Sequence, residues 1–334
     1  MPVKARRCYN RCVKDLVLVT GGAGFIGSHL VERLLAAGAR VRVFDNFSTG
    51  TRANFPFAAK FRGRLEILRG DVRRLDTLVR AARGARVIYH QAAMRSVPRS
   101  VKDPLGANAN NVTGTLNVLE AARRCRVRRV VYASSSSVYG ARPDLPKRED
   151  QPPAPVSPYA VSKAAGEQYA QVWTRLYGVE TVGLRYFNVF GPRQDPKSEY
   201  AAVIPRFILW ALRGRPLEVH GDGTQSRDFT YIDNVVEANV LAARAPDAAG
   251  EVFNVGCGDR VTLLAIVAAL EAILGRPLAR RHTPARAGDV PHTLADVAKA
   301  KRLLAYTPLV GFEEGFRRTV DHFRESPGRK GRAG

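Results

Sequence analysis

The chain has 334 residues, of which 45% are hydrophobic and 25% charged, as is ordinary for a soluble protein with one large or two modest domains. No apolar run is long enough to cross a bilayer, so we expect no membrane association. The formal net charge of +23 would suit a nucleic-acid partner. The basic residues are scattered, however, and no aromatic–basic RNA-binding pattern occurs, so we expect no specific nucleic-acid partner. We attribute the charge to an Arg-rich composition and an anionic substrate.

Both ends of the chain are basic. We expect residues 1–14 to form a basic N-terminal arm without a signal core, which predicts a cytoplasmic protein, and residues 325–334 to form a disordered basic tail. The four cysteines are Cys8, Cys12, Cys125 and Cys257. The first two lie close together but lack a matching second pair, so we interpret all four as reduced thiols and predict no metal site.

A glycine-rich turn follows the first predicted strand. The apolar run Leu16–Thr20 predicts a buried parallel strand, and residues 28–37 have helical periodicity that ends at Gly38. Three glycines at intervals of three residues separate them. Such glycines permit the turn, the approach of a pyrophosphate and close helix packing, so the pattern predicts a dinucleotide site. The cofactor-contacting residues of this turn are predicted to be Gly21, Gly24, Phe25, Ile26 and Gly27.

An acidic residue ends the second predicted strand, Arg40–Phe44. Asp45 stands at the distance from the glycine turn that is expected for a carboxylate gripping the adenosine ribose diol. Since this carboxylate would repel a 2′-phosphate, we expect NAD and not NADP. The alternative is that Asp45 caps a turn at the strand end.

Two further strands are predicted at Leu65–Arg69 and Arg86–His90. Asp71 and Val72 follow the first and are candidates for holding the adenine edge. The second opens into a segment whose small Ala92 and Ala93 suit close approach of the cofactor, and whose Arg95 and Ser96 are candidates for facing the substrate.

A long helix is predicted over Leu105–Arg124, carrying Asn108 and Asn111, and a fifth strand over Arg129–Ala133. Four serines, Ser134 to Ser137, follow this strand. Open α/β sheets place their ligand sites at carboxyl strand ends, so the cluster predicts a site. A serine turn would explain any one of them, but explains four together poorly.

Tyr159 and Lys163 are spaced i, i+4, so both lie on one face of a predicted helix over Tyr159–Tyr177. A free tyrosine has a pKa near ~10, and lowering it by about three units takes roughly 4 kcal/mol. An ammonium about 5 Å away supplies roughly 3 kcal/mol at an effective dielectric constant near 20. A positive charge on an oxidised nicotinamide would supply the rest. The pair therefore predicts a tyrosine base beside a dinucleotide.

Together these motifs resemble the extended short-chain dehydrogenase/reductases. TGGAGFIG, the acid after the second strand, SSSSVYG and SPYAVSK carry the resemblance, and LRYFNVFGPR, VIP, GDGTQSRDFTYID and RAGD extend it toward the UDP-sugar 4-epimerases. The resemblance implies an α/β fold, a Rossmann-type doubly wound parallel sheet with a smaller α/β C-terminal substrate domain. The NAD-binding domain is expected over 15–185 plus 231–256, where a helix near 234–245 and a strand over 251–255 return to the sheet. The UDP-sugar-binding domain is expected over 186–230 and 257–324, with a segment over 262–274.

The resemblance also implies roles for single residues. Ser135 would hydrogen-bond the sugar 4-hydroxyl with Ser136 beside it, Tyr159 would be the base, and Lys163 would bind the nicotinamide ribose. Phe187 would pack near the nicotinamide, Asn188, Arg227 and Arg286 would bind the diphosphate, and Asp289 would hold the uridine ribose. Besides the glycine turn, the expected cofactor contacts are Asp45, Asn46, Asp71, Val72, Ala92, Ala93, Asn111, Ser134, Tyr159, Lys163 and Phe187. The expected substrate contacts are Arg95, Ser96, Ser135, Asn188, Val203, Arg227, Arg286, Asp289 and Thr293, and the expected catalytic residues are Ser135, Ser136, Tyr159 and Lys163.

The implied activity is NAD-dependent 4-epimerisation of a UDP-hexose, either UDP-glucose and UDP-galactose or their N-acetyl analogues, through a transient 4-keto sugar. A nucleotide-sugar 4,6-dehydratase is an alternative, but its Asp-Glu pair is replaced here by Ser136 and Ser137. A UDP-glucuronate 4-epimerase is another, although its relatives usually carry Thr where this chain has Asn188. A non-catalytic NAD-sensing protein is a third.

Two features bear on substrate choice and assembly. Thr293 aligns with a position that limits room for a 2-N-acetyl group, so a small residue there implies tolerance of N-acetylated sugars. Alternatively, Thr293 starts a helix. The helices over Leu105–Arg124 and Tyr159–Tyr177 resemble those that form a four-helix dimer contact, which implies a homodimer.

Overall fold

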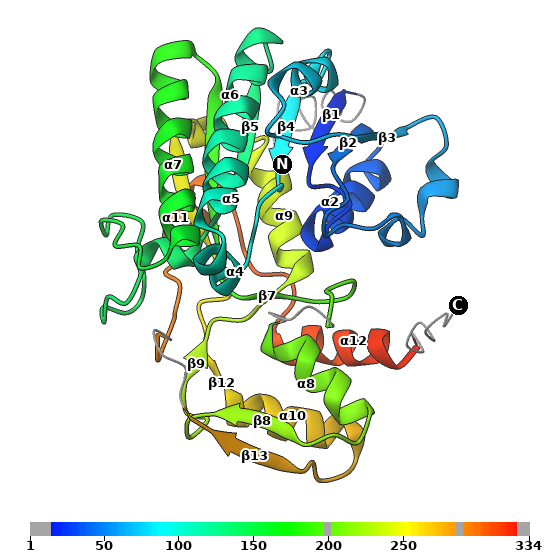
Figure 1. Cartoon of the computed structure of the whole chain (residues 1–334), viewed down its shortest axis with the longest axis vertical. Coiled ribbons are helices and arrows are strands. Elements are labelled where there is room, and N and C mark those ends of the chain that lie inside the picture. The colour runs from blue at the N-terminus through cyan, green and yellow to red at the C-terminus, as the bar shows by residue number, and fades with distance from the viewer. Residues whose placement is uncertain (1–14, 197–201, 285–289, 326–334) are drawn as a thin grey trace.

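The fold is organised around a seven-stranded parallel sheet (Figure 1). The computed structural model describes residues 15–196, 202–284 and 290–325. The strands are β1 (Leu16–Thr20), β2 (Arg40–Asp45), β3 (Leu65–Arg69), β4 (Val87–His90), β5 (Arg129–Ser135), β6 (Glu180–Tyr186) and β11 (Glu251–Val255). They pair in the order β11-β6-β5-β4-β1-β2-β3, which confirms the predicted Rossmann-type sheet. The order reverses between β1 and β4, where such sheets open a crevice for ligands.

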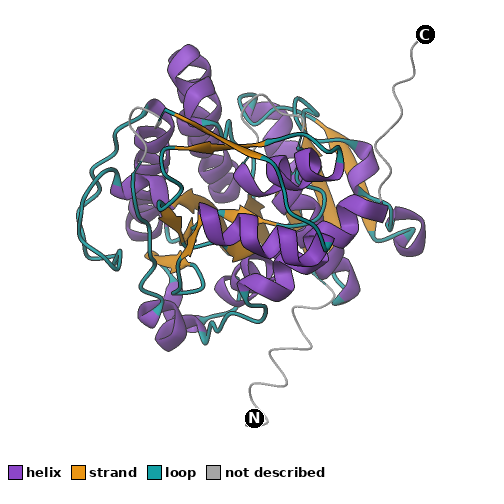
Figure 2. Ribbon diagram, turned by 90° about the horizontal axis from the view of Figure 1, so that it is seen from below, coloured by secondary structure: helices purple, strands orange, loops and turns teal. Residues whose placement is uncertain are grey.

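Helices cover both faces of the sheet (Figures 1 and 2). On one face α2 (Phe25–Ala36) packs on α9 (Ile232–Ala242), and α11 (Ala298–Leu304) packs on α9 and β11. The other face carries α3 (Leu75–Ala82), α6 (Gly114–Arg124) and α7 (Pro158–Tyr177). Residues of β1 alternate between the two resulting cores, since Val17 and Val19 belong to one and Leu18 to the other. A strand buried on both faces explains its unbroken apolar sequence.

The predicted helix over Leu105–Arg124 is not one regular helix. It consists of α5 (Pro104–Asn108), a π-helical segment (Ala109–Thr113) and α6. Asn111 in the π-helical segment hydrogen-bonds the backbone of Met94 and the hydroxyl of Ser162, so tertiary partners accompany the irregular turn. Because these partners are distant in sequence, local periodicity could not predict the irregular turn.

Other boundaries differ by a few residues. The helix predicted to begin at residue 28 begins at Phe25, directly after the glycine turn, and the strand predicted to end at Ala133 continues to Ser135. The helix expected over 234–245 is α9 and begins two residues earlier. Residues 180–186 were not predicted as a strand and form β6. Short 3₁₀ turns occur at Arg52–Asn54, Ala58–Phe61, Ser136–Tyr139 and Pro246–Ala248, and α4 spans Val97–Lys102.

A second lobe lies beyond the carboxyl ends of the strands (Figure 1). Its elements are α8 (Val203–Leu212), β8 (Leu217–His220), β9 (Ser226–Arg227), β12 (Val261–Thr262), α10 (Leu263–Leu274), β13 (Arg280–Thr283) and α12 (Phe312–Glu325). Three short pairs build it or connect it to the sheet: β8 with β13, β9 with β12, and β7 (Val189–Phe190) with β10 (Thr230–Tyr231). Within the described ranges, no helix is both long and apolar enough to cross a membrane.

Candidate active site

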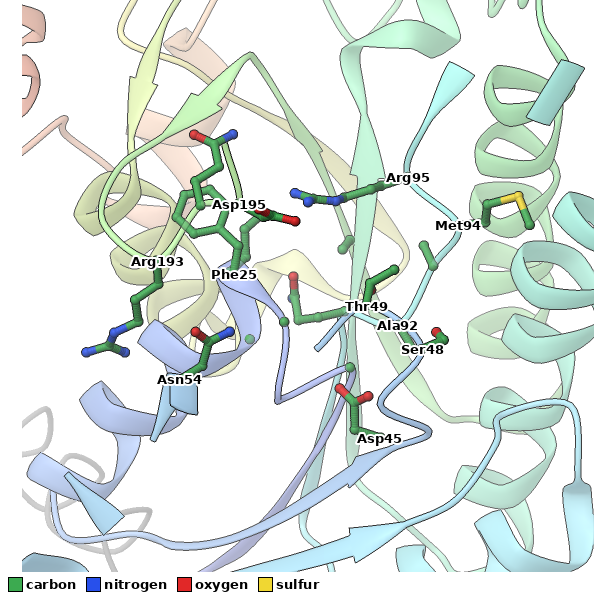
Figure 3. Close-up of a pocket in the computed structure, with 18 of the residues that line it drawn as sticks. Phe25, Asp45, Ser48, Thr49, Asn54, Ala92, Met94, Arg95, Arg193 and Asp195 are labelled. Carbon is green, nitrogen blue, oxygen red and sulfur yellow. The ribbon is translucent and has the colours of Figure 1, made fainter. Parts of the chain in front are cut away.

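A cavity of about 560 Å³ opens at the carboxyl ends of the central strands (Figure 3). The glycine turn, the end of β2, the segment after β4 and the first turns of α7 all contribute to its wall. It therefore collects residues that are far apart in the chain. Most of the predicted cofactor contacts line it: Gly21, Gly24, Phe25, Ile26, Gly27, Asp45, Asn46, Val72, Ala92, Ala93, Ser134, Tyr159 and Lys163.

The glycine turn fits a dinucleotide because it leaves no room for side chains. Gly21 has a φ of +68°, and a Cβ there would lie 2.6 Å from the amide nitrogen of Ala92. A Cβ at Gly27 would lie 2.2 Å from the carbonyl oxygen of Gly21. Helix α2 begins at this turn without a side-chain cap. Its first amides are thus available to an anion in the cavity, as a pyrophosphate requires.

Asp45 ends β2 with its carboxylate in the cavity wall (Figure 3). Its oxygens accept hydrogen bonds from the amides of Ala23 (2.9 Å) and Phe47 (2.8 Å), and burial raises its pKa. Because these two bonds occupy only part of its acceptor capacity, the carboxylate can still receive hydroxyl donors. Both interpretations of Asp45 are thus compatible: it caps the turn and also faces the cavity.

Only one of the two predicted adenine contacts lines the cavity. Val72 lines the cavity, whereas Asp71 is not part of the wall. Arg73 binds Asp71 through two hydrogen bonds of 3.0 and 2.6 Å and lowers its pKa to about 2. Asn46 also donates to Asp71 (3.2 Å). In this structure Asp71 organises the loop that presents Val72.

Tyr159 and Lys163 lie side by side on α7, as the spacing predicts. The Nζ atom of Lys163 lies 5.9 Å from the centre of the Tyr159 ring and donates to the carbonyl oxygen of Ala133 (2.8 Å). Burial lowers the pKa of Lys163 to about 7, while the carboxylate of Glu167 opposes that shift. The ammonium is therefore close to its titration point at neutral pH.

The surroundings of the Tyr159 phenol shift its pKa in both directions. Desolvation raises the pKa of the phenol, and the two opposing influences are a hydrogen bond with Ser135 and the charge of Arg95. Desolvation is the largest of these influences, because a buried phenolate loses its contacts with water. A further cation in the cavity would lower the pKa of Tyr159 toward the range of a base.

The serines after β5 have separate functions. Ser135 is hydrogen-bonded to the Tyr159 phenol, and its hydroxyl accepts from the amide (3.2 Å) and hydroxyl (2.9 Å) of Ser137. Ser134 lines the cavity, but its hydroxyl donates to the Glu167 carboxylate, which also pairs with Arg185. Ser136 begins the following 3₁₀ turn. Ser135 is thus the serine that the fold places with the phenol.

The segment after β4 brings Ala92, Ala93 and Arg95 to the cavity. The hydroxyl of Ser96 instead caps α4 by accepting from the amide of Arg99 (3.2 Å). Asn111 is 1% exposed and does not reach the wall. Its side chain binds the amide (2.8 Å) and carbonyl (3.1 Å) of Met94, so it holds this segment in place.

Two of the predicted substrate contacts, Asn188 and Thr293, are hydrogen-bonded to each other. Asn188 donates to the Thr293 hydroxyl and to the carbonyl of Asp228, each at 3.3 Å, and Arg227 donates to the carbonyl of Pro291 (2.9 Å). Helix α11 begins at Ala298, so the alternative that Thr293 starts a helix is wrong. Val203 is the first residue of α8.

Several predicted residues are not part of the cavity wall: besides Asp71 and Asn111, these are Ser96, Ser135, Ser136, Phe187, Asn188, Val203, Arg227 and Thr293. Phe187 is fully buried, with its ring 6.2 Å from that of Tyr139, and is not part of the wall. Arg286 and Asp289 lie outside the described residues.

Several cavity residues were not predicted. Ser48, Thr49 and Asn54 come from the loop after β2, and Arg193, Asp195 and His322 come from the far side of the cavity (Figure 3 labels all but His322). Arg193 pairs with Glu32 of α2 and lies over the ring of Phe57 at 5.3 Å. It stands within the FGPR motif, which was the only available signal. The loop residues have no distinctive spacing.

Comparisons with known proteins agree with this geometry. The NAD dependent epimerase/dehydratase family matches residues 17–256. A UDP-glucose 4-epimerase of Mycolicibacterium smegmatis is 41% identical over 309 residues, covering 92% of this chain and 98% of that protein. The solved UDP-N-acetylglucosamine 4-epimerase from Methanobrevibacter ruminantium M1, in complex with UDP-N-acetylmuramic acid, is 38% identical with a TM-score of 0.89, over 94% of this chain and 99% of that one. The UDP-glucuronic acid 4-epimerase from Bacillus cereus, in complex with UDP-glucuronic acid and NAD, is 35% identical with a TM-score of 0.86, over 93% and 99%.

Proposed function

Since the chain belongs to the NAD dependent epimerase/dehydratase family, we propose that it catalyses the 4-epimerisation of a UDP-hexose. The observation that carries the proposal is that Tyr159 and Lys163 line the same cavity as the dinucleotide cradle, with Ser135 beside the Tyr159 phenol. Relatives at 41% and 38% identity that are named 4-epimerases of UDP-glucose and UDP-N-acetylglucosamine support the choice of substrate class.

The residues present fit NAD. The glycine turn and the uncapped start of α2 would hold the pyrophosphate, Asp45 would accept the adenosine ribose hydroxyls, and Lys163 would face the nicotinamide ribose. When bound, NAD supplies a site that takes up a hydride and gives it back. The positive charge of its oxidised ring is also the further cation that Tyr159 lacks.

Residues of the chain itself would transfer the proton of the sugar 4-hydroxyl. Ser135 would hydrogen-bond the sugar 4-hydroxyl, and Tyr159 would accept its proton while C4 is oxidised. After the keto sugar turns within the cavity, Tyr159 would return the proton to the new hydroxyl. Arg95 lines the cavity and favours the phenolate, which is the form that Tyr159 needs as a base.

A UDP-uronate is the second candidate substrate because Arg95 and Arg99 both line the cavity and one relative is a UDP-glucuronic acid 4-epimerase. Two features favour a neutral sugar. Asp195 lines the same cavity and points toward Arg95 (Figure 3), so a second carboxylate there would meet a negative charge. Asn188 also stands where relatives acting on uronates usually have Thr.

The test is a substrate panel. The protein is incubated with NAD and with UDP-galactose, UDP-N-acetylglucosamine or UDP-glucuronate, and the products are identified by NMR. We expect the C4 epimer of a neutral UDP-hexose. Tyr159→Phe should abolish turnover, by about 10²–10⁴-fold for a lost acid–base group, while UDP binding persists. No epimer from any of the three sugars would contradict the proposal, and full turnover by Tyr159→Phe would remove Tyr159 from its role.

We further propose a cytoplasmic homodimer and the two-domain division given by the sequence. A stripe of exposed apolar residues on α7 supports the dimer: Val161 (52% exposed), Tyr169 (38%), Val172 (40%) and Leu176 (70%). On α5, which packs on α7, Leu105 is 83% exposed. Contiguous apolar surface of this kind is typical of an interaction face.

A further inference from the structure

The first turn of α7 is anchored differently at Tyr159 than at its neighbours. First-turn amides have no partner within their own helix. Pro158 has no amide hydrogen, and the amides of Ala160 and Val161 donate to the hydroxyl (3.2 Å) and carbonyl (2.9 Å) of Ser157. The amide of Tyr159 donates to the hydroxyl of Ser100, 3.1 Å away. The backbone of Tyr159 is thus held by another element.

Ser100 is built to accept this bond. It lies on α4, is fully buried, and donates its own hydroxyl hydrogen to the carbonyl of Val97 (2.7 Å). With that hydrogen committed, the oxygen presents its lone pairs to the Tyr159 amide. Helix α4 begins directly after Arg95 and Ser96, so Ser100 connects Tyr159 to the segment that carries Arg95.

A second link joins the same two segments. The hydroxyl of Ser162 donates to the carbonyl of Tyr159 (2.7 Å) and accepts from the amide of Asn111 (2.9 Å). Asn111 in turn binds both backbone groups of Met94. Residues 94 and 100 are therefore connected to the carbonyl and the amide of Tyr159, respectively.

From this geometry we propose that Ser100 is a positioning residue for the reaction, which sets the place of the Tyr159 phenol relative to Arg95 and the sugar. Ser100 itself is not among the residues that line the cavity. Because the phenol lies at the far end of its side chain, a small tilt of the first turn moves the hydroxyl more than the backbone. The proposal rests on the proposed function of Tyr159 as a base.

The expected consequence is electrostatic as well as geometric. The ionisable groups that face Tyr159 are Arg95 from the segment before α4, Lys163 from α7 and Tyr132 from β5. The charge of Arg95 and the bond with Ser135 oppose the effect of desolvation on the phenol. Displacing the phenol from Arg95 weakens that opposition, so the pKa of Tyr159 should rise.

The test compares Ser100→Ala and Ser100→Cys, which remove a good acceptor, with Ser100→Thr, which keeps the hydroxyl. The matched control is Thr181→Val. Thr181 is 1% exposed, and its hydroxyl donates to the carbonyl of Ala170 (2.7 Å) and bonds the hydroxyl of Thr174 (2.8 Å). This variant therefore removes buried hydroxyl bonds near the other end of the same helix. All variants are studied as NAD-loaded proteins.

We expect Ser100→Ala and Ser100→Cys to lower kcat by about 10–100-fold, while KM for UDP-galactose stays within about threefold of the wild-type value. The acid limb of the kcat–pH profile should move to higher pH by about half a unit or more. Ser100→Thr should recover kcat to within about threefold. Thr181→Val should lower the melting temperature but leave kcat and the pH profile unchanged.

A readout independent of turnover separates this proposal from the proposed function. The ionisation of Tyr159 is followed by the NMR signal of its labelled Cζ atom, which is identified by its loss in Tyr159→Phe. The pKa obtained from this titration should be higher in Ser100→Ala than in the wild type. If the wild-type protein epimerises no UDP-sugar, the proposed function fails and the titration still tests Ser100. An unchanged titration in Ser100→Ala would overturn the proposal, as would an equal loss of kcat in Thr181→Val.

Discussion

At the scale of single residues, burial governs the site as much as charge does. Desolvation raises the pKa of Tyr159 and lowers that of Lys163 to about 7, so both shifts disfavour the charged forms that catalysis needs. Charges brought by the cofactor and by Arg95 act against this cost.

The glycine turn provides a residue-scale prediction. Gly27→Ala places a Cβ 2.2 Å from the carbonyl oxygen of Gly21, so α2 has to move away from the turn. We expect a loss of about 1–3 kcal/mol in the free energy of unfolding, as for other overpacked sites, together with loss of NAD from the purified protein. Chemical denaturation and the absorbance of bound cofactor measure the two effects.

The matched control is Gly311→Ala, because a Cβ at Gly311 meets no atom within 4 Å. This variant should remain within about 0.5 kcal/mol of the wild type and retain NAD. Equal effects of the two substitutions would show that the close packing at Gly27 is not what matters.

At the scale of elements, a few buried polar side chains hold segments from distant parts of the chain together. Asp228, between β9 and β10, accepts hydrogen bonds from the amides of Cys257 (2.8 Å), Gly258 (3.0 Å) and Ala295 (3.1 Å). Asp228→Asn replaces one acceptor oxygen with a donor that faces these amides. We expect it to destabilise the protein by about 2–3 kcal/mol in chemical denaturation.

Asp222→Asn serves as the control for Asp228. Asp222 is exposed and accepts from the amide (2.9 Å) and hydroxyl (2.8 Å) of Thr224, a role that one asparagine oxygen can retain. Its effect should stay within about 0.5 kcal/mol. If Asp228→Asn were equally harmless, the three amide bonds would contribute little to stability.

His90 connects β1, β4 and the start of α6, and it makes a prediction about pH. Its ring lies between the hydroxyls of Thr20 (2.7 Å) and Thr115 (3.0 Å), and burial lowers its pKa from 6.5 to about 3. Below about pH 6.5, His90 therefore binds a proton in the unfolded chain but stays neutral in the native protein. This contribution to stability is present above pH 6.5 and is lost as the pH falls toward 3, by about 1.4 kcal/mol per pH unit.

Other buried groups also make the stability of the protein depend on pH, some in the same direction as His90 and some in the opposite direction. His29, which is hydrogen-bonded to the carbonyl of Pro192, has its pKa lowered to about 3 in the same way. Burial raises the pKa of Asp228 to about 6, so its contribution is present below pH 3.8 and lost as the pH rises through 6. The measurement is therefore a difference: His90→Phe should be less stable than the wild type at pH 7.5, and the gap should narrow on acidification. A gap that is constant from pH 7 to pH 4.5 would contradict a neutral buried His90.

At the scale of the whole molecule, the unpartnered apolar stripe on α7 predicts assembly. Leu176 is 70% exposed there, and Leu309, outside the stripe in the segment before α12, is 64% exposed. A charge at a buried interface is strongly unfavourable, whereas a charge on a free surface is tolerated. Light scattering after size-exclusion chromatography should show a dimer for the wild type and Leu309→Glu, and a monomer for Leu176→Glu. A dimer in all three proteins would place the interface elsewhere.

The sequence alone determined the parts of the protein that depend on neighbours in the chain. The glycine turn, the acid at the end of β2 and the i, i+4 pair of Tyr159 and Lys163 were predicted because strand, turn and helix geometry follow local spacing. The doubly wound parallel sheet followed from the resemblance and is confirmed.

Only the tertiary structure decided which side chains meet. It turned the hydroxyl of Ser134 toward Glu167, used Ser96 as a helix cap, assigned Asn111 to the Met94 segment and tied Ser100 to the amide of Tyr159. It also desolvates the Tyr159 phenol, which raises its pKa. The Ser96 cap is local, since its partner Arg99 is three residues away. For Asn111, Ser134 and Ser100 the partners lie 17, 33 and 59 residues away, and no local pattern encodes such contacts.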